Sequence, residues 1–203
     1  MPAVPATERD ESLGALLLAR ARAAIGRALG RAVELPDDPA LAVRGATLVA
    51  LSVDGKLRGR AGGARPVRAL RDDVAANAVA AALHAPDSVP LAAAELDALR
   101  IEVALLSEIE FLDFADDAAL LAQLTPFEHG LMLFGGCRGA SFLPGDWRHF
   151  PDPGRFLAAL KARAGVAAER PAGALMAARY RVRTWSESMH VQPREYAGAD
   201  PRA

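Results

Sequence analysis

A predicted β-hairpin that leads through a glycine-rich segment into a helix constrains this fold more than any other feature of the sequence. Residues 46–53 form an extended apolar run, and Asp54-Gly55 separates them from a second run at residues 56–60. An Asp-Gly pair is typical of a type I′ turn, because both turn positions adopt a positive φ. The glycine-rich residues 62–66 then precede an apolar stripe of helical period over residues 67–84, and Pro66 is interpreted as the first helical residue.

The remaining patterns predict strands in hairpins that are separated by helices. Helical periodicity and capping residues indicate helices at residues 7–29, 91–99, 116–124 and 152–164. Extended or alternating runs indicate strands at residues 100–106, 130–134, 138–143 and 180–185. This order favours an α/β (α+β) fold with helices packed on a mostly antiparallel sheet. We expect a single domain over residues 8–186, with a flexible start at residues 1–7 and a C-terminal tail at residues 187–203.

The composition excludes several classes of protein. The chain has 203 residues, of which 52% are hydrophobic and 24% charged, so it can bury a substantial core. Its formal net charge of −1 gives no overall field that would favour nucleic acid or an anionic membrane. The apolar stretch at residues 13–29 is interrupted by arginines and is not expected to span a membrane. The lone Cys137 excludes an intrachain disulfide, and we expect a cytoplasmic protein.

The glycine-rich segment is the best candidate for a functional site. Where a strand runs through glycines into a helix start, free N–H groups and the helix dipole attract anions. The segment lacks the Gly-Lys-Ser/Thr of a P-loop and the glycine spacing of a dinucleotide-binding fingerprint. Two alternatives stay open, namely a tight connection that only requires positive φ angles and a protein-contact loop. The candidate residues of this site are Arg58, Gly59, Arg60, Gly62 and Gly63.

Two further polar residues are candidates for the same pocket. Asn77 falls on the apolar face of the predicted helix, where a buried amide requires hydrogen-bond partners. It either lines the pocket or ties the helix to a neighbouring backbone. Glu102 lies in the predicted strand at residues 100–106. It is either an acid/base group on an inner face or the ion-pair partner of an arginine such as Arg100.

The other titratable residues do not predict a site. Arg179, Arg181 and Arg183 alternate along the last predicted strand, but a nucleic-acid surface needs wider basic support and exposed aromatic residues. Because aromatic residues make up only 5% of the chain, we do not expect nucleic-acid binding. The four histidines are scattered without metal-ligand spacing, and Cys137 is interpreted as an incidental thiol. The sequence therefore predicts no metal and no other cofactor.

Several short blocks along the chain carry a family resemblance. The first are Leu57-Arg58-Gly59-Arg60-Ala61-Gly62, the helical segment Val74-Ala75-Ala76-Asn77-Ala78-Val79, and Leu99-Arg100-Ile101-Glu102-Val103. The later ones are His129-Gly130-Leu131, Ser141-Phe142-Leu143-Pro144 with Trp147, and Phe156-Leu157 with Leu160-Lys161 and Ala164-Gly165. In order and spacing, these blocks resemble the AMMECR family, which is called protein A of the AmmeMemoRadiSam system in prokaryotes. The resemblance covers residues 16–185.

The resemblance implies a fold and a set of neighbours rather than a reaction. It implies a central antiparallel sheet with flanking helices and a small subdomain. It also implies a genetic association with a Memo-like protein and a radical SAM protein. The biochemical activity of the family is uncharacterised, with proposed roles near RNA and in a modification pathway.

Two departures from the family pattern affect the candidate site. Arg60 and Ala61 stand where the family signature Leu-Arg-Gly-Cys-Ile-Gly has cysteine and isoleucine, so no thiol-based activity is expected at this position. Asp87 stands where the family usually has the arginine of Asp-Pro-Arg-Phe. We expect Asp87 to pair with Arg60 if the two loops meet.

These observations lead to one main hypothesis and three alternatives. We expect an accessory or small-ligand-binding protein with a cleft at the glycine-rich segment, in which Arg58 and Arg60 hold an anion and Asn77 and Glu102 support the pocket. One alternative is an enzyme that uses a concave, partly buried Glu102 as an acid/base group. The others are an interaction module with a flat apolar patch, and an RNA-associated protein with a continuous basic stripe through residues 179–183.

Overall fold

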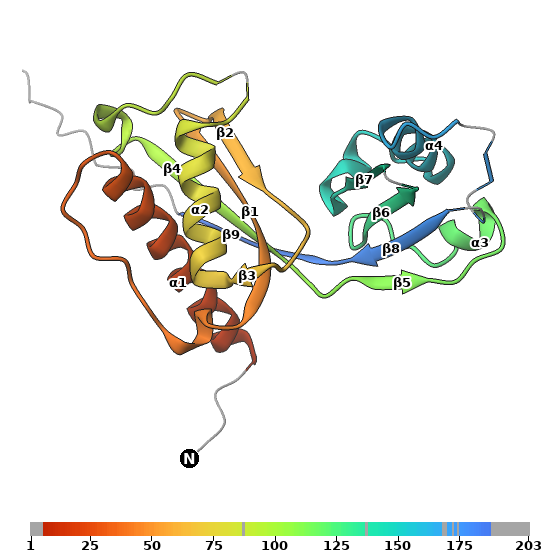
Figure 1. Ribbon diagram of the computed structural model, residues 1–203, viewed down its shortest axis with the longest axis horizontal. Coiled ribbons are helices and arrows are strands. Elements are labelled where there is room, and N and C mark those ends of the chain that lie inside the picture. The colour runs from red at the N-terminus through yellow and green to blue at the C-terminus, as the bar shows by residue number, and fades with distance from the viewer. Residues whose placement is uncertain are drawn as a thin grey trace, which may run out of the picture.

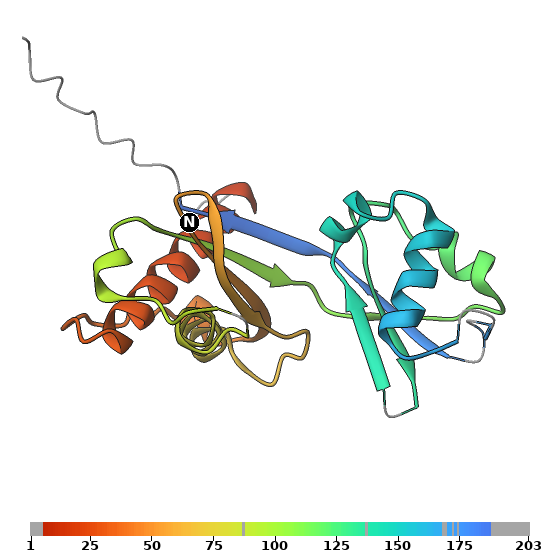
Figure 2. The same ribbon diagram turned by 90° about the horizontal axis from the view of Figure 1, so that it is seen from above.

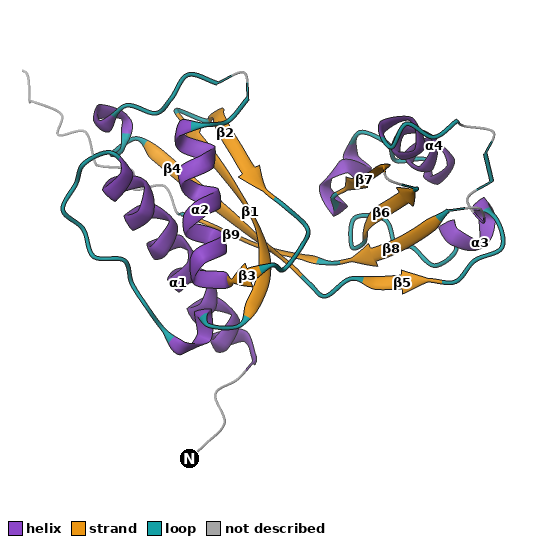
Figure 3. Cartoon of the chain, in the orientation of Figure 1, coloured by secondary structure: helices purple, strands orange, loops and turns teal. Residues whose placement is uncertain are grey.

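The protein has two lobes that are joined by a pair of extended segments (Figure 1). The computed structural model describes residues 6–86, 88–136, 138–167, 170–171, 173 and 175–187. Each lobe contains one antiparallel sheet with helices packed on it (Figure 3). The predicted α/β (α+β) class is therefore confirmed, and the smaller second lobe corresponds to the expected subdomain.

The first lobe is a five-stranded sheet whose inner face packs on two helices. Its strands run in the order β2-β1-β4-β9, and the short β3 pairs with the start of β1. The strands are β1 Arg44–Val53, β2 Lys56–Gly62, β3 Arg68–Ala69, β4 Leu99–Leu106 and β9 Val182–Ser186, and the helices are α1 Ala6–Ala28 and α2 Leu70–Leu83. Alternate side chains of β1 and β4, among them Val49, Leu51, Ile101 and Val103, are buried in one core with both helices. Because successive side chains of a strand point to opposite faces, the sheet has one face in the core and one outer face.

The second lobe repeats this layering on a smaller scale. Its sheet has the order β5-β8-β6-β7. The strands are β5 Glu110–Leu112, β6 Gly130–Gly135, β7 Arg138–Phe142 and β8 Met176–Tyr180, and the helices are α3 Asp117–Leu121 and α4 Pro153–Arg163. The indole of Trp147 is fully buried and stacks on Phe156, with ring centroids 3.8 Å apart. Trp147 belongs to a 3-10 helix, Pro144–Arg148, that follows β7.

Two chain crossings and a small apolar cluster join the lobes. β4 leads into β5 and β8 leads into β9, and the two connecting segments run side by side (Figure 2). The Ser107 N–H donates to the Arg181 carbonyl oxygen at 2.9 Å, and the Arg181 N–H donates to Ser107 Oγ at 2.9 Å. The buried members of the cluster are Ala46 and Leu106 of the first lobe and Met132, Ala178 and Tyr180 of the second.

The predicted hairpin is confirmed in detail. β1 pairs with β2 in antiparallel register, from Leu48 opposite Gly62 to Val53 opposite Lys56. Asp54 and Gly55 have φ angles of 50° and 75°, as a type I′ turn requires. A register shift between Leu51 and Ser52 adds a bulge that the sequence did not indicate.

The prediction that Pro66 begins the following helix is wrong. The chain stays extended through β3, which pairs with Arg44 and Gly45, and α2 begins only at Leu70. The Leu70 N–H donates to the Val43 carbonyl oxygen at 2.9 Å, which anchors the helix start to β1 instead of leaving it free. The glycine-rich segment therefore does not run directly into a helix N-terminus.

Two other element predictions need correction. The strand predicted at residues 180–185 is the junction of two strands, because Tyr180 ends β8 in one sheet and Val182 begins β9 in the other. Arg181 between them bonds to Ser107 at the crossing. The helix predicted at residues 91–99 is reduced to a 3-10 turn, Ala93–Glu95, in which the Glu95 carboxylate accepts from the Ala92 N–H at 2.8 Å.

The first residue of the predicted C-terminal tail is held in the fold. The Glu187 carboxylate accepts from Nε and Nη2 of Arg22, both at 2.6 Å, and from the Ile101 N–H at 3.0 Å. The other residues of that tail lie outside the described part of the chain. Within the described part, no helix is long and apolar enough to cross a membrane.

The packing of α2 on β2 predicts that substitution of two glycines has different effects on stability. A Cβ at Gly59 would lie 2.2 Å from the Ala81 carbonyl oxygen, and neither backbone can move freely. We therefore expect Gly59→Ala to lower the free energy of unfolding by about 1–3 kcal/mol, as other overpacked substitutions do. A Cβ at Gly63 would meet no atom within 4 Å, so the control Gly63→Ala should change stability by less than about 1 kcal/mol. Urea denaturation measures both, and equal losses would contradict this packing.

Candidate functional site

The glycine-rich segment lies against β1 and then turns toward the second lobe (Figure 3). Gly62 has a φ of 151°, and a Cβ there would lie 2.3 Å from the Thr47 carbonyl oxygen. The Gly63 N–H donates to the same oxygen at 3.3 Å. Gly62 is thus required for close approach to β1, whereas Gly63 is open to solvent.

This segment forms one wall of a cavity between the two lobes, which we call the interlobe cavity. The first lobe contributes Leu48, Arg60, Gly62, Gly63, Ala64 and Leu106. The second lobe contributes Ser141, Leu143, Asp146, Arg163 and Tyr180. The cavity has a volume of about 210 Å³. The structure therefore brings three of the predicted site residues, Arg60, Gly62 and Gly63, to a single concave site.

Two arginines from different lobes face the interlobe cavity. Arg60 lies at the end of β2 and Arg163 at the end of α4. Neither forms an ion pair with a carboxylate of the described residues. The Arg163 guanidinium lies 5.7 Å from the centroid of the Phe142 ring, which orients it without neutralising it. The cavity thus carries two guanidinium groups that are available to an anion.

The second lobe also contributes side chains with oxygen atoms to the interlobe cavity, among them Tyr180 and Asp146. The Tyr180 hydroxyl donates to the Phe142 carbonyl oxygen at 3.0 Å, and Asp146 Oδ2 accepts from the Leu143 N–H at 2.7 Å. Burial raises the pKa of Tyr180 to about 12, so its hydroxyl stays protonated at neutral pH. Gly130 leaves room for the phenol ring, since a Cβ there would lie 2.6 Å from the tyrosine Cζ.

The structure places Arg58 outside the interlobe cavity. Its Nε and Nη2 donate to the two carboxylate oxygens of Glu95, each at 3.1 Å, and its Nη1 donates to the Val89 carbonyl oxygen at 2.8 Å. These hydrogen bonds, with one from the Ala92 N–H, hold the pKa of Glu95 below its usual value. Arg58 therefore fixes the loop after α2 to the sheet, and we do not propose that it binds an anion.

Asn77 and Glu102 also lie away from the cavity. The buried Asn77 amide donates to the Thr47 carbonyl oxygen and Oγ1, both at 3.0 Å, and to Asp73 Oδ2 at 2.9 Å. It ties α2 to β1, as one of its two interpretations proposed. Glu102 is exposed on the outer face of the sheet, where its register neighbours are Ala50 and Ser186. Gly59 serves the contact between β2 and α2 described above.

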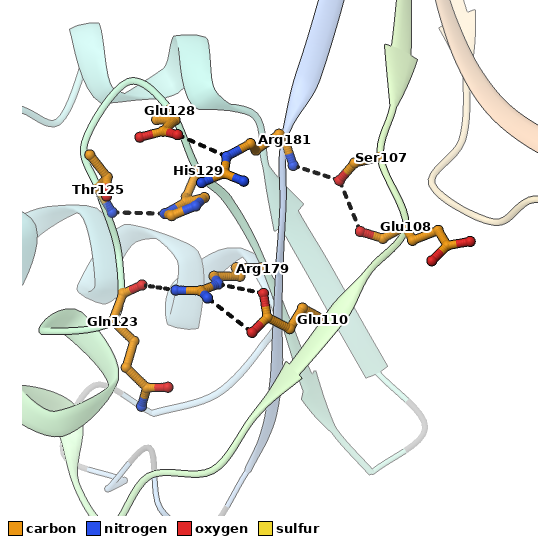
Figure 4. Close-up of polar contacts among 9 residues, drawn as sticks. All are labelled: Ser107, Glu108, Glu110, Gln123, Thr125, Glu128, His129, Arg179 and Arg181. Atoms are coloured by element: carbon orange, nitrogen blue, oxygen red, sulfur yellow. Dashed lines mark hydrogen bonds and ion pairs between the residues drawn. The ribbon is translucent and has the colours of Figure 1, made fainter.

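The three alternating arginines do not form a free basic stripe. Arg179 donates to both carboxylate oxygens of Glu110 at 2.9 Å, and Arg181 pairs with Glu128 at 2.8 Å (Figure 4). Arg183 pairs with Asp10 of α1. Each of these three arginines is thus paired with a carboxylate, so they do not form the continuous unpaired basic stripe that the RNA-associated alternative expected.

A buried histidine lies beside these ion pairs (Figure 4). The Thr125 N–H donates to His129 Nδ1 at 2.9 Å. Burial lowers the pKa of His129, and the nearby Arg179 and Arg181 lower it further. The described residues contain no group of three or more histidine, cysteine, aspartate or glutamate side chains that could hold a metal. Asp87, Cys137 and His190 lie outside the described residues, so the expected pairing of Asp87 with Arg60 stays a prediction.

The second lobe supplies site residues that the sequence interpretation did not include. Ser141, Asp146, Arg163 and Tyr180 are far from the glycine-rich segment in the chain, and the two crossings between the lobes bring them near it. A signal for Ser141 was present, because it belongs to one of the blocks that resemble the family. The other three had no distinguishing pattern.

Comparison with known families identifies the chain. A family model described as AMMECR1 matches residues 18–185, which include both lobes and the interlobe cavity. The chain belongs to the AMMECR1 family. The fold also resembles the crystal structure of the uncharacterized protein PH0010 from Pyrococcus horikoshii, with a TM-score of 0.75 and 23% sequence identity over 87% of this chain and 92% of that one. At this identity, the likeness supports the AMMECR1 fold alone. No curated protein matches the chain.

The buried hydroxyl of Tyr180 gives a direct test of the cavity wall. The chain has two tyrosines, so Tyr180 is the only one in a Tyr196→Phe variant. An ultraviolet titration of that variant should give a phenol pKa of about 12 rather than the ordinary 10.0. Because the folded-state pKa is raised, the neutral phenol stabilises the fold below pH 10, and this contribution should be lost as the pH rises through 12. A titration midpoint near 10 would show that the hydroxyl is solvated.

Proposed function

We propose that this AMMECR1-family protein binds a small anionic molecule in the interlobe cavity and serves as an accessory component of a modification pathway of the AmmeMemoRadiSam type. One observation carries the binding proposal. Arg60 and Arg163 come from different lobes, line the same cavity and have no carboxylate partner among the described residues. Free guanidinium groups at a concave site bind carboxylates and phosphates through paired hydrogen bonds.

The volume of the cavity supports a small ligand. A cavity of about 150 Å³ accommodates benzene, so the observed 210 Å³ suits a molecule of about six to ten non-hydrogen atoms. Most pockets for drug-sized ligands are larger, at about 300–1,000 Å³. The interlobe cavity is therefore matched to a phosphate or a short carboxylate rather than to a dinucleotide.

The geometry favours binding over an acid–base reaction through Glu102. A general acid or base must come within hydrogen-bonding reach of the reacting group. Glu102 is exposed on the outer face of the sheet and does not line the interlobe cavity. Asp146 lines the cavity, but one of its oxygens is already engaged by the Leu143 N–H.

Substitution of the two arginines tests the binding proposal. At constant ionic strength, inorganic phosphate and propionate should each raise the Tm of the wild-type protein by a few degrees, because a ligand that binds only the folded state stabilises it. Arg60→Gln and Arg163→Gln should each weaken binding about tenfold or more, since each removes a charge-assisted hydrogen bond. Differential scanning fluorimetry at a series of ligand concentrations measures both effects.

Arg65→Gln is the matched control for these variants. Arg65 lies in the same exposed segment, carries the same charge and does not line the interlobe cavity. Its substitution should leave the ligand-dependent Tm shift unchanged. Equal losses in Arg65→Gln and Arg60→Gln would show that the anions respond only to general positive charge, and the proposal would fail.

The pathway role rests on the family resemblance and on partners that can be tested directly. We propose a cytoplasmic complex with a Memo-like protein and a radical SAM protein. The expected result is that the tagged chain retains both proteins when the three are produced together. If neither is retained, with or without phosphate and propionate, the accessory role is contradicted while the binding proposal stands.

A further inference from the structure

Side chains that can only donate hydrogen bonds and side chains that can accept them line the same interlobe cavity. Arg60 and Arg163 can only donate, because a guanidinium has no acceptor atom. Asp146, Ser141 and Tyr180 present oxygen atoms from the second lobe. A simple carboxylate such as propionate would bind the guanidinium groups and would offer no donor to these oxygen atoms.

The Tyr180 hydroxyl has already committed its hydrogen within the second lobe. The Tyr180 O–H donates to the Phe142 carbonyl oxygen at 3.0 Å. A hydroxyl has one hydrogen and two lone pairs. Toward a ligand, the Tyr180 oxygen can therefore act only as an acceptor, and the Ser141 hydroxyl is able to accept as well.

The carboxylate of Asp146 adds negative charge to the lining of the interlobe cavity. Its Oδ2 accepts from the Leu143 N–H, and Oδ1 has no hydrogen-bond partner among the described residues. Among the ion pairs of the described residues, Asp146 pairs with neither Arg60 nor Arg163, although all three line one cavity. The cavity thus carries charges of both signs that are not paired with each other, and a ligand with both charges would complement them.

The remaining lining residues are apolar or small. Leu48, Ala64, Leu106 and Leu143 are among them, and Leu106 is only 8% exposed. With a volume of about 210 Å³, the cavity has space for a short aliphatic group in addition to two charged groups.

We propose that the ligand of the interlobe cavity is a small zwitterion, a free α-amino acid with a short aliphatic side chain. Its carboxylate binds Arg60 and Arg163, its ammonium group donates to Asp146 and Ser141, and its side chain packs on the leucines. This inference rests on the proposed function and specifies the class of its ligand. In this proposal, Asp146 selects ligands that carry an amine.

Matched ligand pairs test the inference on the wild-type protein. L-alanine and propionate share a carbon skeleton and differ by the ammonium group, and L-valine and isovalerate form a second such pair. We expect each amino acid to bind at least about tenfold more tightly than its carboxylate, because a charge-assisted hydrogen bond distinguishes them. Ethylamine, which lacks a carboxylate, should not bind. Ligand-observed NMR measures these affinities at pH 7.

Asp146→Asn provides the matched variant. Asparagine keeps an acceptor oxygen for the Leu143 N–H and removes only the charge, so the fold should be retained. In this variant the preference for L-alanine over propionate should fall to less than about threefold, while propionate still binds. A preference that survives the substitution would overturn the role of Asp146. If the variant does not fold, the wild-type ligand pairs still decide the proposal.

The outcomes separate this inference from the proposed function. Equal affinities for L-alanine and propionate would overturn the zwitterion while leaving the anion site intact. Failure of phosphate, propionate and both amino acids to bind would overturn the anion site itself.

Discussion

The first lobe and its part of the interlobe cavity depend on the hydrogen bonds of the buried Asp73 carboxylate. The carboxylate accepts hydrogen bonds from the N–H and Oγ1 of Thr47, at 2.8 and 2.7 Å, and from the Asn77 amide at 2.9 Å. Arg68 supplies a compensating charge, with its Nε 3.1 Å from Oδ1. A buried charge is tolerated only when it is satisfied in this way. The network therefore fixes the first turn of α2 against β1.

Thr47 extends this constraint to the functional site. Its carbonyl oxygen accepts from Asn77 and, at 3.3 Å, from the Gly63 N–H. The glycine-rich segment is thus held by the residue that anchors α2, which sets Arg60 and Gly63 at the edge of the interlobe cavity. The second lobe is positioned by the Ser107–Arg181 crossing and by the packing of Tyr180 and Leu106. The cavity is therefore a consequence of two separate constraints that meet between the lobes.

Local patterns were sufficient for the parts of the fold that depend on neighbouring residues. The Asp54-Gly55 turn was predictable because a type I′ turn needs positive φ angles, and Asp-Gly is one of the residue pairs that favour them. The start of α2 was not, since the extended β3 pairing outweighs the preference of Pro66 for a helix start. For the site, the sequence indicated Arg60 but could not separate it from Arg58, because only the fold shows that Glu95 engages Arg58. Arg163 and Tyr180 could not be predicted as site residues, because they reach the cavity only through the pairing of segments that are distant in the chain.

The central claim is that both lobes bind one small anion together. An NMR titration of the isotopically labelled protein with propionate tests it most directly, through the backbone amides of Gly63 in the first lobe and Ser141 in the second. The account predicts that both resonances shift along the titration with the same half-saturation concentration. Shifts confined to one lobe, or spread over exposed arginines such as Arg148 and Arg155, would contradict it.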